Sequence, residues 1–164
     1  MSKTKTFTSQ DIDIIEYKDS YKEDFRQINY QWLESYFEVT DLDKRFFDDP
    51  RKEILEKEGF IYLARLEGEI IGSVALEKVT DKEYTLAKMG VKPGYRGLKV
   101  GQLLMEVALK KTKELKLDSL VLFTNHQLVQ ALNLYCKNGF RFTRLENPLV
   151  ERATIKMVRN WPSD

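Results

Sequence analysis

The chain has 164 residues, a length that suits one compact α/β domain and leaves little room for a second. Hydrophobic residues make up 42% of the chain and charged residues 32%, a balance typical of a globular protein rather than a disordered one. Lys and Arg number 27 against 26 Asp and Glu, so the broad positive charge of a nucleic-acid-binding protein is absent. We therefore expect a single domain over residues 1–164 and no nucleic-acid partner.

The cysteine content and the first residues of the chain exclude further classes of protein. Cys136 is the single cysteine, so neither an internal disulfide nor a cysteine-rich zinc site can form, and no metal is expected. Residues 1–10 are polar, which predicts a flexible start and no signal peptide. No apolar run approaches the ~20 residues that span a bilayer. We expect a cytoplasmic protein without membrane contact, either a monomer or a homodimer.

The first third of the sequence predicts one strand followed by two helices. Residues 11–17 place three isoleucines among acidic residues, as in a first strand. From residue 20 to about 37, aromatic and aliphatic residues recur at helical spacing. Asp48-Asp49-Pro50 indicates either a turn or the start of a helix, and the charged residues 50–57 then form a short second helix.

The middle of the sequence predicts an antiparallel meander. Residues 60–66 and 70–79 are apolar runs rich in strand-forming residues, and Glu67-Gly68-Glu69 joins them as a hairpin. Residues 83–91 form the third member. A loop over residues 92–97 then leads into a long helix with one apolar face made by Val100, Leu103, Leu104, Val107 and Ala108.

The last third alternates strand and helix. Residues 119–124 form a short strand, and the helix after it ends at Asn138-Gly139. Residues 140–145 and 153–158 form two closing strands around Asn147-Pro148. The predicted order is βααβββαβαββ.

The loop at residues 92–97 has the chemistry of an anion site. A loop with glycines that enters a helix exposes unpaired backbone N–H groups at the positive end of the helix dipole, where a pyrophosphate can bind. Gly97 and Gly101 permit close backbone approach, and Arg96 and Lys99 add positive charge. The alternative is a strand-to-helix loop whose glycines serve turn geometry alone.

This segment resembles the acetyl-CoA-binding motif of the GNAT acetyltransferases, Arg/Gln-x-x-Gly-x-Gly/Ala. The chain reads Val91-Lys92-Pro93-x-Tyr95-Arg96-Gly97-x-x-Val100-Gly101. Arg96 and Gly101 take the first and last motif positions. Lys99 stands where the family usually has glycine, and its side chain can point outward if its backbone is already helical.

A second segment is similar to a later motif of the same family, Asn-x-x-Ala-x-x-Leu-Tyr-x-x-x-Gly-Phe. The chain reads Leu128-x-x-Ala131-x-x-Leu134-Tyr135-x-x-x-Gly139-Phe140. Leu128 replaces the usual Asn, and Asn125 is expected to supply part of the hydrogen bonding to the pantetheine arm. In element order the resemblance covers about residues 12–158 and implies the GNAT fold, a mixed, mostly antiparallel sheet flanked by helices.

The resemblance implies acetyl-CoA as co-substrate, held where two central strands splay apart. A backbone N–H near Met89 or Gly90 would polarise the thioester carbonyl, and the slip of the apolar pattern after Leu86 suggests a β-bulge there. The implied donor-binding residues are Met89, Gly90, Val91, Arg96, Gly97, Leu98, Lys99, Val100, Gly101, Gln102 and Asn125.

The resemblance also implies that Tyr135 is the catalytic acid that protonates the departing CoA thiolate. Spacing alone favours a core aromatic at Tyr135, because it shares a helix face with Leu128 and Leu132; the motif around it favours the catalytic role. The family's Glu base aligns with Thr85, which cannot remove a proton. Among the neighbouring titratable residues (Glu77, Glu83 and His126) the pattern favours none, so no base is assigned.

The acceptor is expected to bind beside the first two helices. An aromatic and acidic cluster there suits a cationic amine; the alternative places the aromatics in the core and the carboxylates on a solvated face. The substrate-binding candidates are Trp32, Glu34, Tyr36 and Glu38, with Phe37 and Asp41 beside them.

The leading hypothesis is acetyl transfer to a primary amine of a small molecule by direct attack on the thioester. One alternative acceptor is a protein lysine or N-terminus. A different alternative is a non-catalytic acyl-CoA-binding module, which the loss of the Glu at Thr85 favours and the presence of Tyr135 disfavours.

Overall fold

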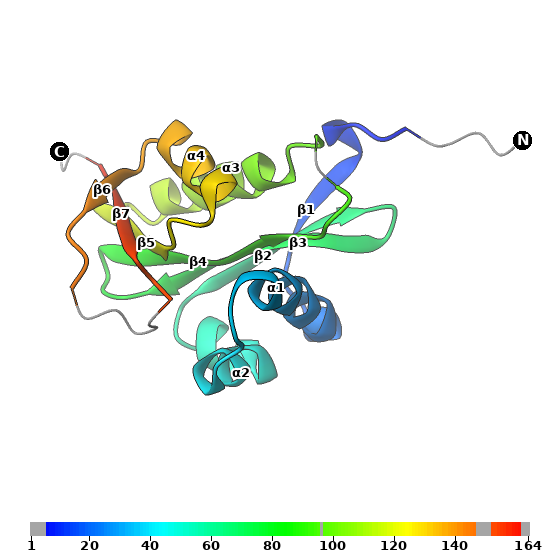
Figure 1. Cartoon of the computed structure of the whole chain (residues 1–164), viewed down its shortest axis with the longest axis horizontal. Helices are drawn as coiled ribbons and strands as arrows, with labels where there is room; N and C mark the ends of the chain where they lie inside the picture. Colours follow the sequence, from blue (N-terminus) through cyan, green and yellow to red (C-terminus); the bar gives the residue numbers. More distant parts are fainter. Residues whose placement is uncertain (1–5, 96, 147–151, 162–164) are drawn as a thin grey trace, which may run out of the picture.

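The computed structural model of the chain describes residues 6–95, 97–146 and 152–161. Within these residues one seven-stranded sheet, in the order β1-β2-β3-β4-β5-β7-β6, carries helices on both faces (Figure 1). The expected fold class, a mixed and mostly antiparallel sheet flanked by helices, is confirmed.

Four antiparallel strands form the first part of the sheet. They are β1 (Ile12–Glu16), β2 (Phe60–Leu66), β3 (Glu69–Lys78) and β4 (Glu83–Val91). The predicted hairpin turn is confirmed: Glu67 and Gly68 have φ of 51° and 81°, the left-handed pair that a two-residue hairpin loop requires. Alternation of apolar residues and this turn were enough to place these strands within a residue or two.

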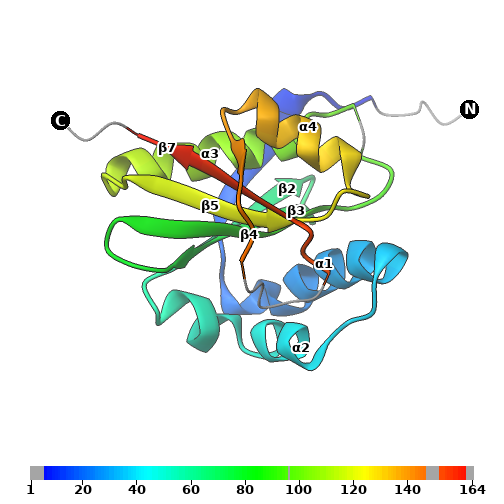
Figure 2. The ribbon, with the colours of Figure 1, turned by 60° about the vertical axis from the view of Figure 1, so that its left-hand side comes forward.

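The second part of the sheet begins where β5 (Ser119–Thr124) lies parallel to β4. β7 (Ile155–Asn160) is antiparallel to β5, and β6 (Arg141–Thr143) pairs with β7 at the edge (Figure 2). β6 is shorter than predicted because it pairs only with three residues of β7, and Phe140 turns into the core with 3% of its surface exposed. Asn147 and Pro148 lie outside the described residues.

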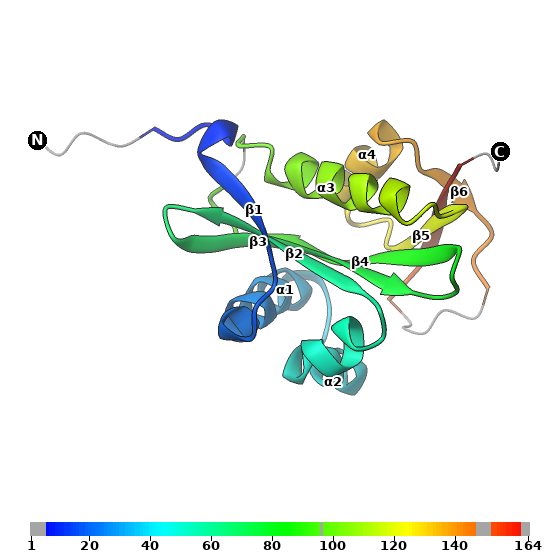
Figure 3. The same ribbon diagram turned by 180° about the vertical axis from the view of Figure 1, so that it is seen from behind.

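Helices α3 (Val100–Glu114) and α4 (Val129–Lys137) cover one face of the sheet, and α1 (Lys22–Tyr36) and α2 (Asp41–Asp48) cover the other (Figure 3). Each face has its own hydrophobic cluster. On α3 the apolar face is rotated slightly from the prediction: Leu103 and Val107 are half-buried, and the buried residues are Val100, Leu104, Met105, Ala108 and Thr112.

A helix before Pro50 was not predicted: α2 starts at Asp41. The short helix predicted over residues 50–57 is present as a π-helical turn, η3 (Arg51–Leu55), which Pro50 precedes. Thr40 Oγ1 accepts a hydrogen bond from Asp43 N at 3.2 Å, and Asp43 Oδ2 accepts one from Thr40 N at 2.9 Å. This capping box, Thr-x-x-Asp, was the sequence signal for the helix start.

The polar start is partly ordered. Residues 1–5 lie outside the described part of the chain, but Thr8 caps a short 3-10 helix, η1 (Ser9–Asp11), and a second, η2 (Asp19–Tyr21), precedes α1. No helix in the described ranges has the length and hydrophobicity to cross a bilayer.

Candidate active site

The two parts of the sheet separate at the centre of the molecule. β4 and β5 pair from Glu83–Ser119 to Leu86–Leu122. Beyond that point β4 continues along β3, whereas β5 continues along β7. The predicted splay of two central strands is confirmed, and it leaves a gap between residues 87–91 of β4 and the end of β5.

The backbone of β4 faces this gap. Lys92 donates its N–H to Ile71 O of β3 at 2.8 Å. Because residues along an antiparallel pair alternate between bonding the partner strand and pointing away from it, the N–H and C=O of Val91 point into the gap. An extended amide-containing ligand can bond there as an added strand would.

A β-bulge at the gap confirms the prediction from the apolar pattern. Between two paired positions β3 has one residue, Val74, whereas β4 has two, Lys88 and Met89. Lys88 adopts a left-handed conformation with φ of 50°. Its carbonyl accepts from Ser73 Oγ at 2.8 Å, and Ser73 Oγ accepts from Asn29 Nδ2 of α1 at 3.0 Å.

Ser73 and Asn29 are fully buried, so α1 fixes the bulge through a chain of hydrogen bonds in the core. Sequence reasoning missed both residues. Their only signal was polarity at positions expected to be apolar, one on a helix face and one inside a strand.

Gly90 follows the bulge and explains the placement of Trp32. A Cβ on Gly90 would lie 2.7 Å from Trp32 Cδ1, so the indole packs directly on the β4 backbone. Trp32 Nε1 also donates to Asn29 Oδ1 at 3.2 Å. Trp32 therefore packs on β4 at the gap. This agrees with the alternative that places the aromatic residues in the core.

The other acceptor candidates lie on the surface. Glu34 and Glu38 are exposed, and Tyr36 has half of its surface exposed. Glu34 borders a broad hollow of about 800 Å³ beside α1, which Lys92 and Tyr95 border from the β4–α3 loop. The four candidates do not converge on one pocket, and their role in acceptor binding stays a hypothesis.

The loop into α3 presents free backbone donors, as an anion site requires. Gly94 and Gly97 have φ of 93° and 84°. The first i to i−4 bond of α3 runs from Leu103 N to Lys99 O, so the N–H groups of Val100, Gly101 and Gln102 precede the helical ladder. Arg96, the first motif residue, lies outside the described residues.

The side chains of Gln102 and Leu98, beside the loop, are engaged within the protein. The Gln102 carboxamide exchanges hydrogen bonds with the Asn138 carboxamide at 3.1 and 2.9 Å, so only its N–H remains for a ligand. Leu98 packs on the core. Gly101 lies against α4, since a Cβ there would be 3.2 Å from Leu134 Cδ2.

Lys99 does not have the helical backbone that would let its side chain simply point outward. It precedes α3 with φ of 57° and ψ of 33°, in the left-handed region. Glycine adopts this conformation without steric cost, which is why the motif favours it there. Lys99 adopts this conformation although its Cβ makes it sterically unfavourable.

We expect Lys99→Gly to raise the free energy of unfolding by about 1 kcal/mol, because it removes the contact between Cβ and the backbone that disfavours left-handed residues. Lys110→Gly is the matched control. Lys110 is exposed within α3, so there the same change should lower the free energy by about 1 kcal/mol. Urea unfolding of both variants measures the difference, and equal destabilisation by the two would refute the assignment of strain to Lys99.

Tyr135 is buried on the face of α4 that packs on the sheet, with 9% of its surface exposed. Its ring meets Phe140 edge-on, with centroids 6.0 Å apart. Burial raises the pKa of Tyr135 to about 12, so the phenol keeps its proton throughout the neutral range. The structure thus shows a packed aromatic whose hydroxyl stays protonated at neutral pH.

Asn125 directly follows β5 and lies four residues before the start of α4. Its Oδ1 accepts from Gln127 N at 2.9 Å, and its Nδ2 donates to Arg152 O at 2.6 Å. Both ends of the predicted pantetheine-binding carboxamide are thus engaged within the protein, which leaves one Nδ2 hydrogen for a ligand.

The residues around Thr85 do not supply an obvious base. Thr85 lies directly opposite Glu77 of β3, but Glu77 Oε1 is 3.1 Å from Lys88 Nζ, which also lies 4.1 Å from the Phe46 ring centroid. Glu83 accepts from Ser119 Oγ at 3.2 Å. His126 is exposed and its ring lies 3.2 Å from the Thr154 hydroxyl.

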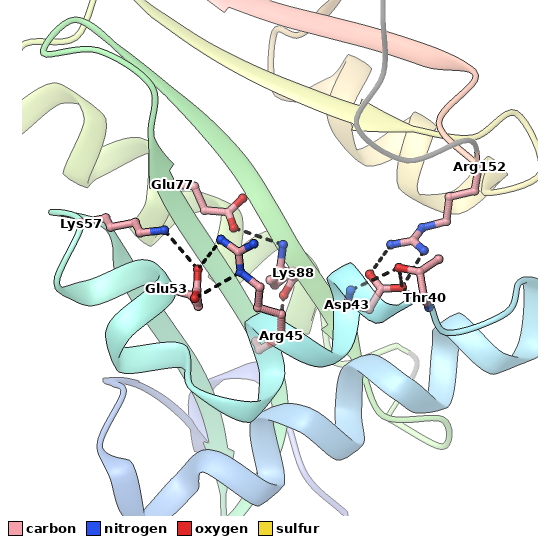
Figure 4. A network of polar contacts seen from close by, with 9 residues as sticks. Thr40, Asp43, Arg45, Glu53, Lys57, Glu77, Lys88 and Arg152 are labelled. Carbon is pink, nitrogen blue, oxygen red and sulfur yellow. Dashed lines mark hydrogen bonds and ion pairs between the residues drawn. The ribbon is translucent and has the colours of Figure 1, made fainter.

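An ion pair that sequence reasoning missed lies beside the gap (Figure 4). Arg152 donates from Nη1 to Asp43 Oδ2 at 2.8 Å and from Nη2 to Asp43 Oδ1 at 2.6 Å. Burial would raise the pKa of Asp43, but hydrogen bonds from Arg152 and Thr40 outweigh it and hold that pKa below its usual value. The carboxylate therefore stays charged at neutral pH.

Among the described residues no group of three His, Cys, Asp or Glu side chains is arranged to hold a metal ion. The site consists of a backbone-lined gap, a helix N-terminus and a buried phenol.

Comparison with known proteins identifies the family. The sequence model of the Acetyltransferase (GNAT) family matches residues 26–140. A curated relative, "Probable N-acetyltransferase camello" of Xenopus tropicalis, is 25% identical over 122 residues, which are 70% of this chain and 56% of the relative. The chain thus spans about half the length of that protein.

Solved structures share the whole fold. A GNAT-family acetyltransferase from Staphylococcus aureus Mu50 superposes with a TM-score of 0.84 at 27% identity, over 91% of this chain and 98% of that one. The PaiA N-acetyltransferase of Thermoplasma acidophilum, solved in complex with coenzyme A, gives 0.74 at 17% identity, over 92% and 99%. A GNAT acetyltransferase from Elizabethkingia anophelis with acetyl-CoA bound gives 0.66 at 23% identity, over 92% and 99%. The chain belongs to the GNAT family of acetyltransferases.

Proposed function

We propose that the protein is an acetyl-CoA-dependent N-acetyltransferase that acetylates a primary amine by direct attack on the thioester. The observation that carries the proposal is the combination of three features in one fold. They are the N–H groups at the start of α3 that precede its helical ladder, the β4 backbone beyond its pairing with β5, and the buried Tyr135 in the hydrophobic cluster on the α3–α4 face of the sheet.

Each feature matches one part of acetyl-CoA. The N–H groups of residues 97–102 suit the pyrophosphate, with Lys99 adding charge and Arg96 assigned by the motif. The backbone of Met89 and Val91 suits the amides of the pantetheine arm. A backbone N–H at Met89 or Gly90, turned by the bulge, would then donate to the thioester oxygen as negative charge develops there.

The reaction needs no cofactor beyond the co-substrate. The amine nitrogen attacks the carbonyl carbon, the C–S bond breaks, and the sulfur leaves as a thiol with the proton of Tyr135. The amine gives up one proton to solvent, so an amide and coenzyme A are the products. Tyr135 regains a proton from solvent before the next turnover.

A second candidate, a non-catalytic acyl-CoA-binding module, is favoured by Thr85 and by the engagement of Glu77 with Lys88. Release of thiol from acetyl-CoA, measured over a panel of small amines and lysine-containing peptides, separates the two. Amine-dependent release supports the enzyme. Tight binding of acetyl-CoA without release from any amine would favour the module.

A further inference from the structure

One peptide unit of the β4 bulge is held by a side chain from the neighbouring strand. Lys88 and Met89 together face Val74 of β3, so the regular ladder is interrupted there. The Lys88 carbonyl accepts a hydrogen bond from Ser73 Oγ at 2.8 Å instead. Lys88 has φ of 50°, a conformation that is sterically unfavourable for a residue with a Cβ and persists only where its surroundings support it. The bond from Ser73 is such a support.

The hydrogen bonds behind this contact have one possible direction. Asn29 Nδ2 donates to Phe25 O at 2.9 Å and to Ser73 Oγ at 3.0 Å. Trp32 Nε1, which can only donate, lies 3.2 Å from Asn29 Oδ1 and so fixes the orientation of the carboxamide. Because the Ser73 oxygen receives its hydrogen bond from Asn29, its own hydrogen is directed to the Lys88 carbonyl.

Asn29 and Ser73 are both fully buried, where α1 packs on β3 and β4 (Figure 3). Removal of one member would leave a buried polar group without its partner, whereas an apolar pair of the same shape can fill such a space at little cost in stability. The polar pair therefore adds something that core packing does not need, which is a fixed orientation of the Lys88–Met89 peptide.

The direction of the Lys88 carbonyl determines the direction of the Met89 N–H. The peptide between the two residues is trans, and in a planar trans peptide the C=O and N–H groups point in nearly opposite directions. Because the carbonyl points to Ser73 of β3, the Met89 N–H points away from Ser73. β5 lies on the opposite side of β4 from β3, and its pairing with β4 has ended at Leu86.

The Gly90 N–H has a different direction. Gly90 lies opposite Ser73 in the ladder, two residues before Lys92, whose N–H bonds Ile71 O of β3. Because residues of an antiparallel pair alternate between bonding the partner strand and pointing away from it, the Gly90 N–H points to β3. Of the two N–H groups at the bulge, only that of Met89 is therefore turned away from the β3 ladder.

We propose that Ser73 and Asn29 are positioning residues for acetyl transfer, which orient the Met89 N–H toward the thioester oxygen. The inference rests on the proposed transferase function and identifies Met89, rather than Gly90, as the source of the backbone donor. A hydrogen bond weakens steeply as it departs from linearity, and a donor that is already oriented needs no reorganisation when negative charge develops on the oxygen.

Ser73→Ala removes the hydrogen bond to the Lys88 carbonyl and frees the peptide to turn. We expect kcat to fall at least about tenfold, because loss of a whole oxyanion donor lowers kcat about 100-fold or more and this variant misdirects the donor. The dissociation constant for acetyl-CoA should stay within about threefold of wild type, since the pyrophosphate contacts at α3 remain. Steady-state kinetics and calorimetry measure the two quantities.

Infrared spectroscopy of bound acetyl-CoA, labelled with carbon-13 at the thioester carbonyl, reports on the donor directly and needs no amine. A hydrogen bond to the carbonyl oxygen weakens the C=O bond and lowers its stretching frequency. Binding to the wild type should lower this frequency, and in Ser73→Ala the shift should shrink to about half or less as the donor loses its alignment. A role of Ser73 in packing alone would not move this band.

Thr112→Val is the matched control. The Thr112 hydroxyl is also buried and donates to a backbone carbonyl, that of Leu109, at 2.7 Å, but it lies near the C-terminal end of α3. This variant should lose stability as Ser73→Ala does and keep wild-type kcat and the wild-type band. Ser73→Cys, which keeps a side chain of similar size with a weak donor, serves if the alanine variant fails to fold and should show the same losses to a smaller extent.

Losses of kcat and of the band shift that occur together in the Ser73 variants support the inference. An unchanged band or a wild-type kcat in Ser73→Ala, or equal losses in Thr112→Val, overturns the inference and leaves the transferase intact. A wild type that binds acetyl-CoA but transfers acetyl to no amine overturns both.

Discussion

Tyr135→Phe is expected to lower kcat about 100-fold or more while leaving the affinity for acetyl-CoA nearly unchanged. The variant keeps the ring that packs edge-on against Phe140 and removes only the hydroxyl. Without the hydroxyl, the CoA sulfur must leave as a bare thiolate in a buried site, where charge is poorly solvated. Steady-state kinetics and calorimetry on the same preparation measure the two quantities.

Tyr17→Phe is the matched control for this change. Tyr17 is as buried as Tyr135 but packs in the cluster under α1, and its hydroxyl has no hydrogen-bond partner within the described residues. The control should therefore leave kcat unchanged. If Tyr135→Phe turned over at the wild-type rate, Tyr135 would be a core aromatic and not the catalytic acid.

The pH profile gives an independent check on the acid. Because burial raises the pKa of Tyr135 to about 12, the protonated form persists well above the ordinary tyrosine value of about 10. The account expects no loss of kcat from Tyr135 between about pH 8 and 10. A fall centred near pH 10 in the wild type that vanishes in Tyr135→Phe would contradict the buried position.

Gly101→Asp is expected to raise the dissociation constant for acetyl-CoA about 100-fold or more, because it puts a carboxylate among the N–H groups that receive the pyrophosphate. An acidic residue in the first turn of a helix is itself favourable, so the fold should tolerate the charge. Calorimetry with acetyl-CoA measures the loss.

Gly101→Ala separates charge from crowding. Its Cβ would meet Leu134 Cδ2 at 3.2 Å, a contact that the flexible leucine can relieve. The alanine variant should therefore bind acetyl-CoA within about tenfold of wild type, since the phosphate-facing donors remain. Equal binding by the aspartate variant and the wild type would show that the pyrophosphate does not lie at the start of α3.

Sequence patterns predicted the parts of the fold that depend on residues close to one another in the chain. The strands β2 to β4 follow from alternation of side chains and from a turn that needs two left-handed residues, and both signals lie within a few positions. The bulge followed from a slip in the same alternation. The loop over residues 92–97 was predicted from a motif that exposes the backbone N–H groups of a helix N-terminus.

The remaining features of the fold and of the candidate site depend on contacts between residues that are distant in sequence. Trp32 was predicted to bind the acceptor from its type, and its packing on Gly90 of β4, which adds a structural role, could not be read from the sequence. The left-handed backbone of Lys99 could not be predicted, because the sequence of a loop does not fix φ. The helix after Pro50 was predicted, but α2 was missed because the capping box at Thr40 was not weighed.

The ion pair between Asp43 and Arg152 shows most clearly what the sequence could not predict. Neither Asp43 nor Arg152 has a motif, and only the fold brings together residues 109 apart. An acidic residue near a helix start predicts a cap, which Asp43 also makes. Its second partner could not be predicted, because it comes from the other part of the sheet.

The most direct test of the central claim is a single-turnover reaction with acetyl-CoA labelled with carbon-13 in the acetyl group, followed by mass spectrometry of the amine and of the intact protein. Direct attack predicts labelled amide and free coenzyme A in equal amounts, formed only when amine is present, with no label on the protein. Coenzyme A released without labelled amide, or label on the exposed thiol of Cys136 in the absence of amine, would contradict it.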